Sequence, residues 1–311
     1  MNANELRQRH EAGETDFAGV NLRGANLNGI ELLGVNLDSA DLQSASLVFA
    51  YLSRVSLGKA NLSHGKLSGI NLYKSDLRQI NLGDAELHGA NLQGSDFRKA
   101  NLALANLLDA NLSKADLRNA NLSGACLRGA CLRGANLRYE KRVYEPVNLR
   151  GANLRNADLR DVNLTHADLT KADLTGANLS HCNLRGAKLT RAILNQTNLS
   201  NAVMTQAYLA GASAIEANLS GALVASAKFK EANLQKANLH LTNLARTDLS
   251  RADLSFANLK EADLLEVNLA KANLAGANLA GANLFEADLS LTNMKGTNLS
   301  RATMPDGDVH E

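Results

Sequence analysis

The sequence is poor in the residues that most proteins use to build a compact core or to cross-link a chain. It has no Trp, only 4% aromatic residues, three Cys and two Pro in 311 residues. No apolar run approaches the roughly 20 residues of a membrane span. The opening residues, MNANELRQRHEAGETD, contain no apolar stretch of the kind found in signal peptides. We therefore expect neither a disulfide-rich nor a membrane protein, and we predict a cytoplasmic location.

The charges nearly cancel, with 33 Lys and Arg against 31 Asp and Glu and a net charge of +2. A protein that attracts nucleic acid through its overall charge is strongly basic, and one that imitates DNA is strongly acidic. The composition therefore predicts no nucleic-acid partner and no membrane partner.

What the sequence has in abundance is a repeat of five residues. A Leu or another apolar residue, here called the centre, recurs at every fifth position from Phe17 to Leu137 and from Leu149 to Met304, usually within Ala-(Asn/Asp)-Leu-x-x. Helices repeat apolar residues every 3.6 positions and strands every second, so a period of five indicates a short extended step followed by a corner. The centre and the residue two before it then point inward, and the residues flanking the centre point outward.

Four such steps would close a coil of 20 residues, and the sequence supports this length. Asn recurs at every twentieth position from Asn178 to Asn298, and Asp-x-Arg recurs at residues 76–78, 96–98 and 116–118. Self-similarity at a fixed step is typical of stacked repeats. We predict an all-β quadrilateral β-helix of about 14 coils with a Leu interior.

Both ends are predicted to be capped. Residues 1–13 contain a short capping helix from Asn4 to Ala12, stopped by Gly13, with Leu6 available to cover the first coil. Residues 305–311 form a C-terminal turn and tail. Caps are expected because the open edge of a stacked sheet would aggregate.

The repeats form two segments, residues 14–137 and 149–304, separated by a predicted loop at residues 138–148. Leu137 and Leu149 are 12 residues apart, two more than two repeats. Continuing the register of the second segment would bury Arg142, which is too costly for an unpaired charge. Pro146 and Pro305 lie in the loop and just beyond the last centre, as expected if nearly every coil N–H donates to a neighbouring coil.

No group of residues suggests catalysis or metal binding. Cys126 and Cys131 occupy outward positions and are interpreted as free thiols, whereas Cys182 occupies an inward position and fills the core. The seven His have no ligand spacing, and His181 and Cys182 point in opposite directions. Since GxSxG, P-loop, GxGxxG and HExxH motifs are also absent, we expect no catalytic, cofactor or metal site and no enzyme.

The repeated Ala-(Asn/Asp)-Leu-x-x units resemble the pentapeptide-repeat family. The opening Glu5-Leu6-Arg7 and the closing Met304-Pro305 are similar to cyanobacterial members. The resemblance implies a right-handed quadrilateral β-helix and a non-enzymatic regulatory protein that binds another protein, as in heterocyst differentiation. It also implies an alternative, a DNA-mimicking inhibitor of DNA gyrase. Such inhibitors are strongly acidic, so the net charge of +2 argues against this alternative.

Two surfaces compete as the place where a protein partner binds. The register gathers five apolar residues around one corner of the first coils, and contiguous patches with aromatic residues usually mark interfaces. The competing surface is a column of Arg, each preceded two residues earlier by Asp. A solvated charged face and idle surface variation are the alternative interpretations. The apolar residues are Leu33, Val48, Phe49, Tyr51 and Tyr73, and the column consists of Arg78, Arg98 and Arg118.

Two further places are secondary candidates. Leu265 and Phe285 stack near the other end and could serve self-association, so we expect a monomer or a weak homodimer. The loop carries Tyr139, Arg142 and Tyr144, and it is either a partner contact or a tolerated insertion. In both cases it should be the first site of limited proteolysis.

Overall fold

The computed structural model describes residues 1–138 and 146–311 and divides into two compact units, Met1–Asp158 and Leu159–Glu311. The division falls between Asp158 and Leu159, not at the loop predicted for residues 138–148.

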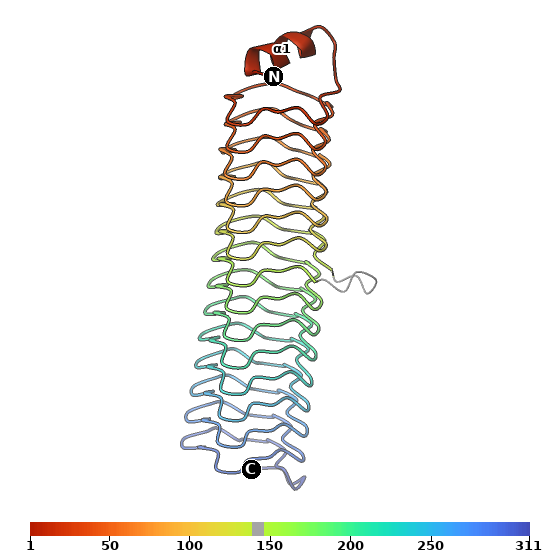
Figure 1. Cartoon of the computed structure of the whole chain (residues 1–311). Helices are drawn as coiled ribbons and strands as arrows, with labels where there is room; N and C mark the ends of the chain where they lie inside the picture. The colour runs from red at the N-terminus through yellow and green to blue at the C-terminus, as the bar shows by residue number, and fades with distance from the viewer. Residues whose placement is uncertain (139–145) are drawn as a thin grey trace. The chain divides into compact units, whose positions relative to one another are not determined.

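Unit 1 is a stack of coils joined by isolated parallel β-bridges between residues 20 positions apart (Figure 1). Asp16 pairs with Asn36 and Asn21 with Asp41, and one bridge follows every five residues. The backbone supports this register, since Leu22 N donates to Asp41 O at 2.7 Å. The 20-residue coil predicted from the sequence is therefore confirmed within the unit.

The centres fill the interior of each unit. Phe17, Phe97 and Leu117 in unit 1 and Phe229 in unit 2 are at most 1% exposed. The residue two positions before the centre is also inward, with the exception of the exposed Thr15, and where it is a buried polar residue its side chain is hydrogen-bonded. The buried Thr197, for example, donates its hydroxyl to Leu174 O at 2.8 Å. The inward and outward assignment made from the sequence holds in both units.

The corners adopt a left-handed backbone conformation two residues after each centre. Gly24 has a φ of 67°, but Phe49 and Leu104 have φ values of 54° and 60° at the same position. Such a conformation costs a non-Gly residue about 1–2 kcal/mol. Hydrogen bonds between coils hold it, since Phe49 N donates to Ser68 O at 3.0 Å. Gly is thus only one of the residues that these corners accept.

Helix α1 spans Ala3–Glu11 and lies across the first coil (Figure 1). The prediction of Asn4 to Ala12 was one residue late, because Asn2 is the N-cap and its side chain accepts the N–H of Glu5 at 2.9 Å. Leu6 is the one buried residue of α1. Gly13 follows the helix with a φ of 92°.

The predicted loop is shorter at its C-terminal side than expected. Val147 is fully buried in the position two before the centre Leu149, and Asn148 forms a parallel bridge with Asn121, 27 residues earlier. The insertion therefore adds seven residues to one 20-residue coil. The 12 residues from Leu137 to Leu149 are therefore one repeat of five residues plus seven inserted residues, and not two repeats plus two residues. Residues 147 and 148 belong to the coil and not to the loop.

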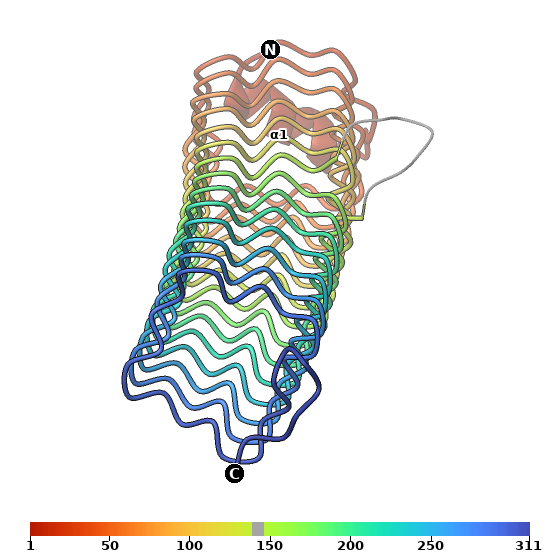
Figure 2. The same ribbon diagram turned by 90° about the horizontal axis from the view of Figure 1, so that it is seen from below.

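Unit 2 repeats the same coil and ends in a reversal of the chain. Figure 2 shows its successive coils lying over one another when seen from below. Met304-Pro305-Asp306-Gly307 forms the expected turn, with Gly307 N donating to Met304 O at 3.0 Å. The tail then pairs back in an antiparallel bridge between Thr303 and Val309. Because the tail covers only part of the last coil, the centres Leu289, Met294 and Leu299 are half-buried.

Candidate interaction surface

The apolar residues predicted at one corner of the first coils form a surface that is mostly exposed, here called the N-terminal patch (Leu33, Val48, Phe49, Tyr51 and Tyr73). Leu33, Phe49 and Tyr51 are exposed, whereas Val48 and Tyr73 are half-buried. The register fixes their neighbours, since Gly34 N donates to Ser53 O and Arg54 N donates to Tyr73 O. Leu33 and Tyr73 thus lie in one column with Ser53 between them, as predicted.

Phe49 contributes most of its ring to this patch because of its place at the corner. The residue 20 positions later is Gly69, and the Phe49 ring lies directly over it: a Cβ built on Gly69 would be 2.4 Å from two ring carbons. The ring can therefore lie against the backbone of Gly69 because this residue has no side chain. Two residues further on, Tyr51 is held by backbone bridges to Glu31 and Asn71.

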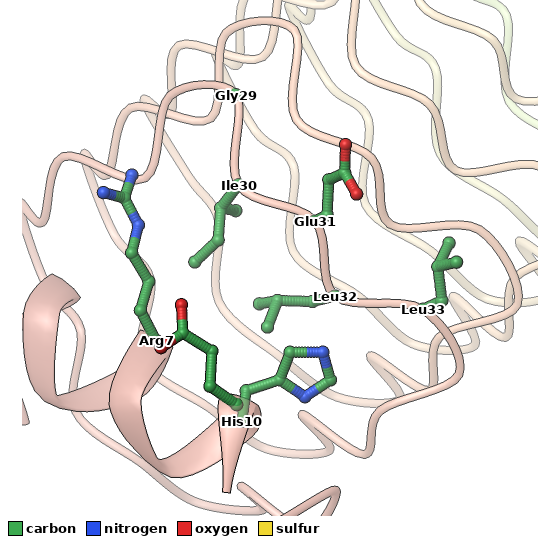
Figure 3. Close-up of a pocket in the computed structure, with 8 residues that line it drawn as sticks. Arg7, His10, Gly29, Ile30, Glu31, Leu32 and Leu33 are labelled. Atoms are coloured by element: carbon green, nitrogen blue, oxygen red, sulfur yellow. The ribbon is translucent and has the colours of Figure 1, made fainter. Parts of the chain in front are cut away.

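A groove between α1 and the first coils adjoins the N-terminal patch, and sequence reasoning missed it (Figure 3). The groove has a volume of about 480 Å³ and is lined by residues of α1 and by residues 29–33. Ile30 and Leu32 point toward the helix, and Glu31 points away from it. Leu33 belongs to both the groove and the patch, so the two form one continuous surface. The residues of α1 that line the groove are Arg7, His10 and Glu11.

The Arg column is a ladder of ion pairs. Nη2 of Arg98 lies 2.6 Å from a carboxylate oxygen of Asp96 in the same coil, and its Nε lies 3.9 Å from Asp116 in the next coil. Arg78 and Arg118 pair with Asp76 and Asp116 in the same way. The ladder is solvated at Arg78 and Arg98, whose side chains are 55% and 41% exposed, and less so at Arg118, whose side chain is 16% exposed. Its charges are already paired within the chain, which makes it a poorer candidate for a partner surface.

The ladder predicts a pH dependence of stability. The hydrogen bond from the Arg78 guanidinium, partly opposed by burial, lowers the pKa of Asp76 below its ordinary value of 3.8. A lowered folded-state pKa adds stability that is fully present above the ordinary pKa and is lost as the pH falls through the folded-state pKa. Asp76→Asn should therefore cost up to about 1 kcal/mol at pH 7. Thermal melts at pH 7 and at a pH near 2.5 should show this difference shrinking, and a constant difference would contradict the assignment.

The secondary candidate in unit 2 shares its row of bridges with two further apolar residues that sequence reasoning missed. Leu265 is half-buried and Phe285 is exposed, and Glu266 N donates to Phe285 O between their coils at 2.9 Å. Val203 and Leu223 form a bridge with each other, and each directly precedes a centre. The same row of bridges continues to the coils that carry Leu265 and Phe285. The signal was present in the sequence, because Val203 and Leu223 occupy positions that usually hold Asn or Asp.

The remaining residues that the sequence singled out are those of the loop and the three Cys. Tyr139, Arg142 and Tyr144 lie outside the described residues. Cys126 and Cys131 are half-buried, and the thiol of the buried Cys182 contacts Leu159 O at 2.7 Å. Residues 1–138 and 146–311 contain no group of three or more His, Cys, Asp and Glu arranged to bind a metal ion. The same residues include no helix of the length and apolarity that a membrane crossing requires.

The 20-residue coils define a β-helical repeat protein. The pentapeptide-repeat profile matches eight stretches of the sequence, from residues 15–48 to residues 262–301. The chain therefore belongs to the pentapeptide-repeat family and, like other members, forms a right-handed β-helix.

Solved structures of the same family are similar to this chain. HetL, a pentapeptide repeat protein involved in heterocyst differentiation regulation in the cyanobacterium Nostoc sp. strain PCC 7120, is 31% identical, with 100% of each chain covered and a TM-score of 0.29. A pentapeptide repeat protein of the Arabidopsis thaliana thylakoid lumen is 30% identical over 35% of this chain and 67% of its own, with a TM-score of 0.26. QnrB1, a plasmid-mediated fluoroquinolone resistance protein, is 18% identical over 70% of this chain and 88% of its own, with a TM-score of 0.37. No curated protein matches the chain.

Proposed function

We propose that this protein is a non-enzymatic scaffold that binds a regulatory protein through the N-terminal patch and the adjoining groove. The scaffold is a quadrilateral β-helix of about 14 coils. The observation that carries the proposal is the exposure of Phe49 (67%) and Tyr51 (54%) beside Leu33, on a surface that continues into the groove under α1.

The energetics favour this surface for binding. A large aromatic side chain buries about 150–250 Å² when covered, and aromatic residues are enriched among the residues that dominate binding energy. Phe49 is held over Gly69, and Tyr51 lies between two bridged coils. A surface whose backbone is already fixed loses little backbone conformational entropy when a partner binds.

The identity with HetL supports a regulatory partner, and a regulator of cell differentiation in a cyanobacterium is the partner that we propose. The cytoplasmic location also stays a prediction. Inhibition of DNA gyrase by DNA mimicry is less well supported, because the net charge is +2 and the candidate surface is apolar. We propose a monomer or a weak homodimer, with Leu265 and Phe285 as the place of self-association.

The test is the double variant Phe49→Glu with Tyr51→Glu, which should lose the partner because two carboxylates would have to be buried at its interface. Unit 2 offers a matched control, Phe256→Glu with Tyr208→Glu. Phe256 is also 67% exposed at a corner over a Gly, Gly276, and Tyr208 is 51% exposed in the same position relative to its centre. Both variants and the wild type would be used to isolate partners from a cyanobacterial lysate, with identification by mass spectrometry.

A protein that is retained by the wild type and the control, but not by the Phe49 and Tyr51 variant, supports the proposal. Equal retention by both variants contradicts it, provided that circular dichroism shows both to be folded. A DNA supercoiling assay with gyrase tests the alternative function. Inhibition of gyrase by the wild-type protein would replace the proposed function with that alternative.

A further inference from the structure

An exposed tyrosine in unit 2 lies among basic residues. Tyr208 directly precedes the centre Leu209 and is 51% exposed. Residues 181–230 contain five Lys and Arg against one Glu, although the chain as a whole is nearly neutral. Four of these five basic residues lie in the coils directly before and after that of Tyr208, and all four are exposed. We call Tyr208 and these four the basic tyrosine patch; the four are Lys188, Arg191, Lys228 and Lys230.

Two of the lysines flank Tyr208 in its own row of bridges. Lys188 and Lys228 each form a parallel bridge with Tyr208, so the three residues share one outward face. Neighbouring strands are about 4.8 Å apart, which places the backbones of the two lysines about 10 Å from each other with the tyrosine between them. On each side the row then continues into an Asp, Asp168 or Asp248, whose carboxylate accepts the backbone N–H two residues later. The positive part of the row is therefore three coils long.

The other two basic residues lie beside the end of the same strand. Arg191 N donates to Ala210 O at 3.0 Å, two residues after Tyr208. In the next coil, Lys230 O accepts the N–H of Gly211 at 3.0 Å. The Arg191 side chain extends over Gly211, since a Cβ built on this glycine would be 3.6 Å from Cγ of Arg191. Cationic side chains therefore border the strand of Tyr208 from the coils on both sides.

The charges of the patch are not neutralised within the part of the chain that the structure describes. No carboxylate of residues 1–138 and 146–311 forms an ion pair with any of the four basic residues. The acidic residues nearby pair elsewhere: Glu216 lies 3.8 Å from Nζ of Lys236, and Glu231 lies 3.3 Å from Nη1 of Arg251. Like charges in adjacent coils repel each other, and a bound polyanion would remove this repulsion.

We infer that the basic tyrosine patch binds single-stranded nucleic acid. Proteins that bind single strands combine positive charges along the phosphate backbone with aromatic side chains on which bases stack. Tyr208 provides the ring for stacking, and Lys188 and Lys228 have flexible side chains that can reach the phosphates on both sides of the stacked nucleotide. Arg191 adds a planar fork of donors that suits a phosphate group.

This inference concerns a local surface, whereas the net charge of +2 argues only against attraction by the chain as a whole. The patch favours a single strand over a duplex, because the bases of a duplex are stacked on each other and are not available to Tyr208. An acidic protein segment would use the four positive charges but not the aromatic ring. The patch lies in unit 2 and the N-terminal patch in unit 1, so the inference goes beyond the proposed function and does not depend on it.

The test measures binding of fluorescein-labelled single strands of about 12 nucleotides, oligo(dT) and oligo(U), by fluorescence anisotropy at low salt. Tyr208→Ala should weaken binding about tenfold because a stacking contact is lost, and Tyr208→Phe should retain binding because the ring remains. Tyr51→Ala is the matched control. Tyr51 is 54% exposed in the same position before a centre, but its bridge partners are Glu31 and Asn71 in place of two lysines.

A second pair of variants tests the phosphate contacts. Each contact to a single strand adds about 0.7 to the slope of log affinity against log salt concentration, so Lys188→Gln with Lys228→Gln should reduce this slope by about 1.4. Lys66→Gln with Lys295→Gln removes the same charge from exposed positions outside the patch and should leave the slope unchanged. Thermal melts confirm that all variants are folded.

No binding of either single strand by the wild type would overturn the inference, as would equal weakening by Tyr208→Ala and Tyr51→Ala. Tighter binding of a DNA duplex, or of a polyglutamate peptide of matched charge, would also overturn it, in favour of a duplex or an acidic protein partner. Binding of one single strand in preference to the other supports the inference and shows which sugar the patch prefers. Tyr51 belongs to the N-terminal patch and its variant should keep oligonucleotide binding, so failure here and failure of the proposed function are distinguishable.

Discussion

Leu117→Asp is expected to unfold the coils around it and to lower the stability of unit 1 by on the order of 4–5 kcal/mol, or to prevent folding. Leu117 is fully buried, with the equally buried centres Phe97 and Leu137 in the coils before and after it. Its N–H donates to Asn136 O at 2.9 Å, so the side chain cannot turn outward without breaking the inter-coil register. A carboxylate at this position would lie among apolar centres without a partner.

Asn178→Asp is the matching outward change in unit 2. Oδ1 of Asn178 accepts the N–H of Ser180 at 3.1 Å and Nδ2 of Asn198 at 3.3 Å. A carboxylate still accepts both hydrogen bonds, so the cost should stay within about 1 kcal/mol. Thermal melts followed by circular dichroism compare the two variants. Similar shifts in melting temperature would refute the inward and outward assignment.

Leu6→Asp should have the second largest effect, a loss of about 3–5 kcal/mol in unit 1. Leu6 is completely buried, and it is the one buried residue of the otherwise polar helix α1. Placing a carboxylate there should detach α1 and uncover the apolar end of the first coil. The exposed edge would then be free to pair with other chains, so aggregation is expected as well.

Leu33→Asp is the control for this second prediction, because Leu33 lies beside the same helix in the groove but is exposed. It should change stability by less than about 1 kcal/mol. Urea denaturation measures the stabilities, and light scattering measures aggregation. If Leu6→Asp is as stable and as soluble as Leu33→Asp, then α1 does not cap the coil.

Much of the candidate surface could be predicted, because the column of each residue follows from its number. Leu33 and Tyr73 are 40 residues apart and were placed in one column through Ser53, which the backbone hydrogen bonds confirm. The exposed fraction of each side chain could not be predicted in this way. Val48 and Tyr73 occupy outward positions but are half-buried by their surroundings, and Nζ of Lys74 lies 5.1 Å from the Tyr73 ring centroid. Exposure depends on side-chain packing between coils, which the period does not encode.

The ion-pair ladder shows the same division. The column of Arg78, Arg98 and Arg118, each preceded two residues earlier by Asp, could be predicted from the sequence. Whether each carboxylate reaches the Arg could not be predicted, and the 2.6 Å between Arg98 and Asp96 shows that it does.

The sequence by itself determined the coil, because the five-residue period assigns each residue an inward, outward or corner position, and this assignment repeats without reference to distant contacts. The parallel bridges between residues 20 apart and the buried centres follow from it. The tertiary structure alone decided where the segments outside the period lie. The groove depends on how α1 lies against residues 29–33. The cap at the other end depends on the pairing of Thr303 with Val309. The length of the seven-residue insertion follows only from the bridge between Asn121 and Asn148. These segments are positioned by contacts that occur once in the chain, and a contact that does not recur leaves no periodic signal in the sequence.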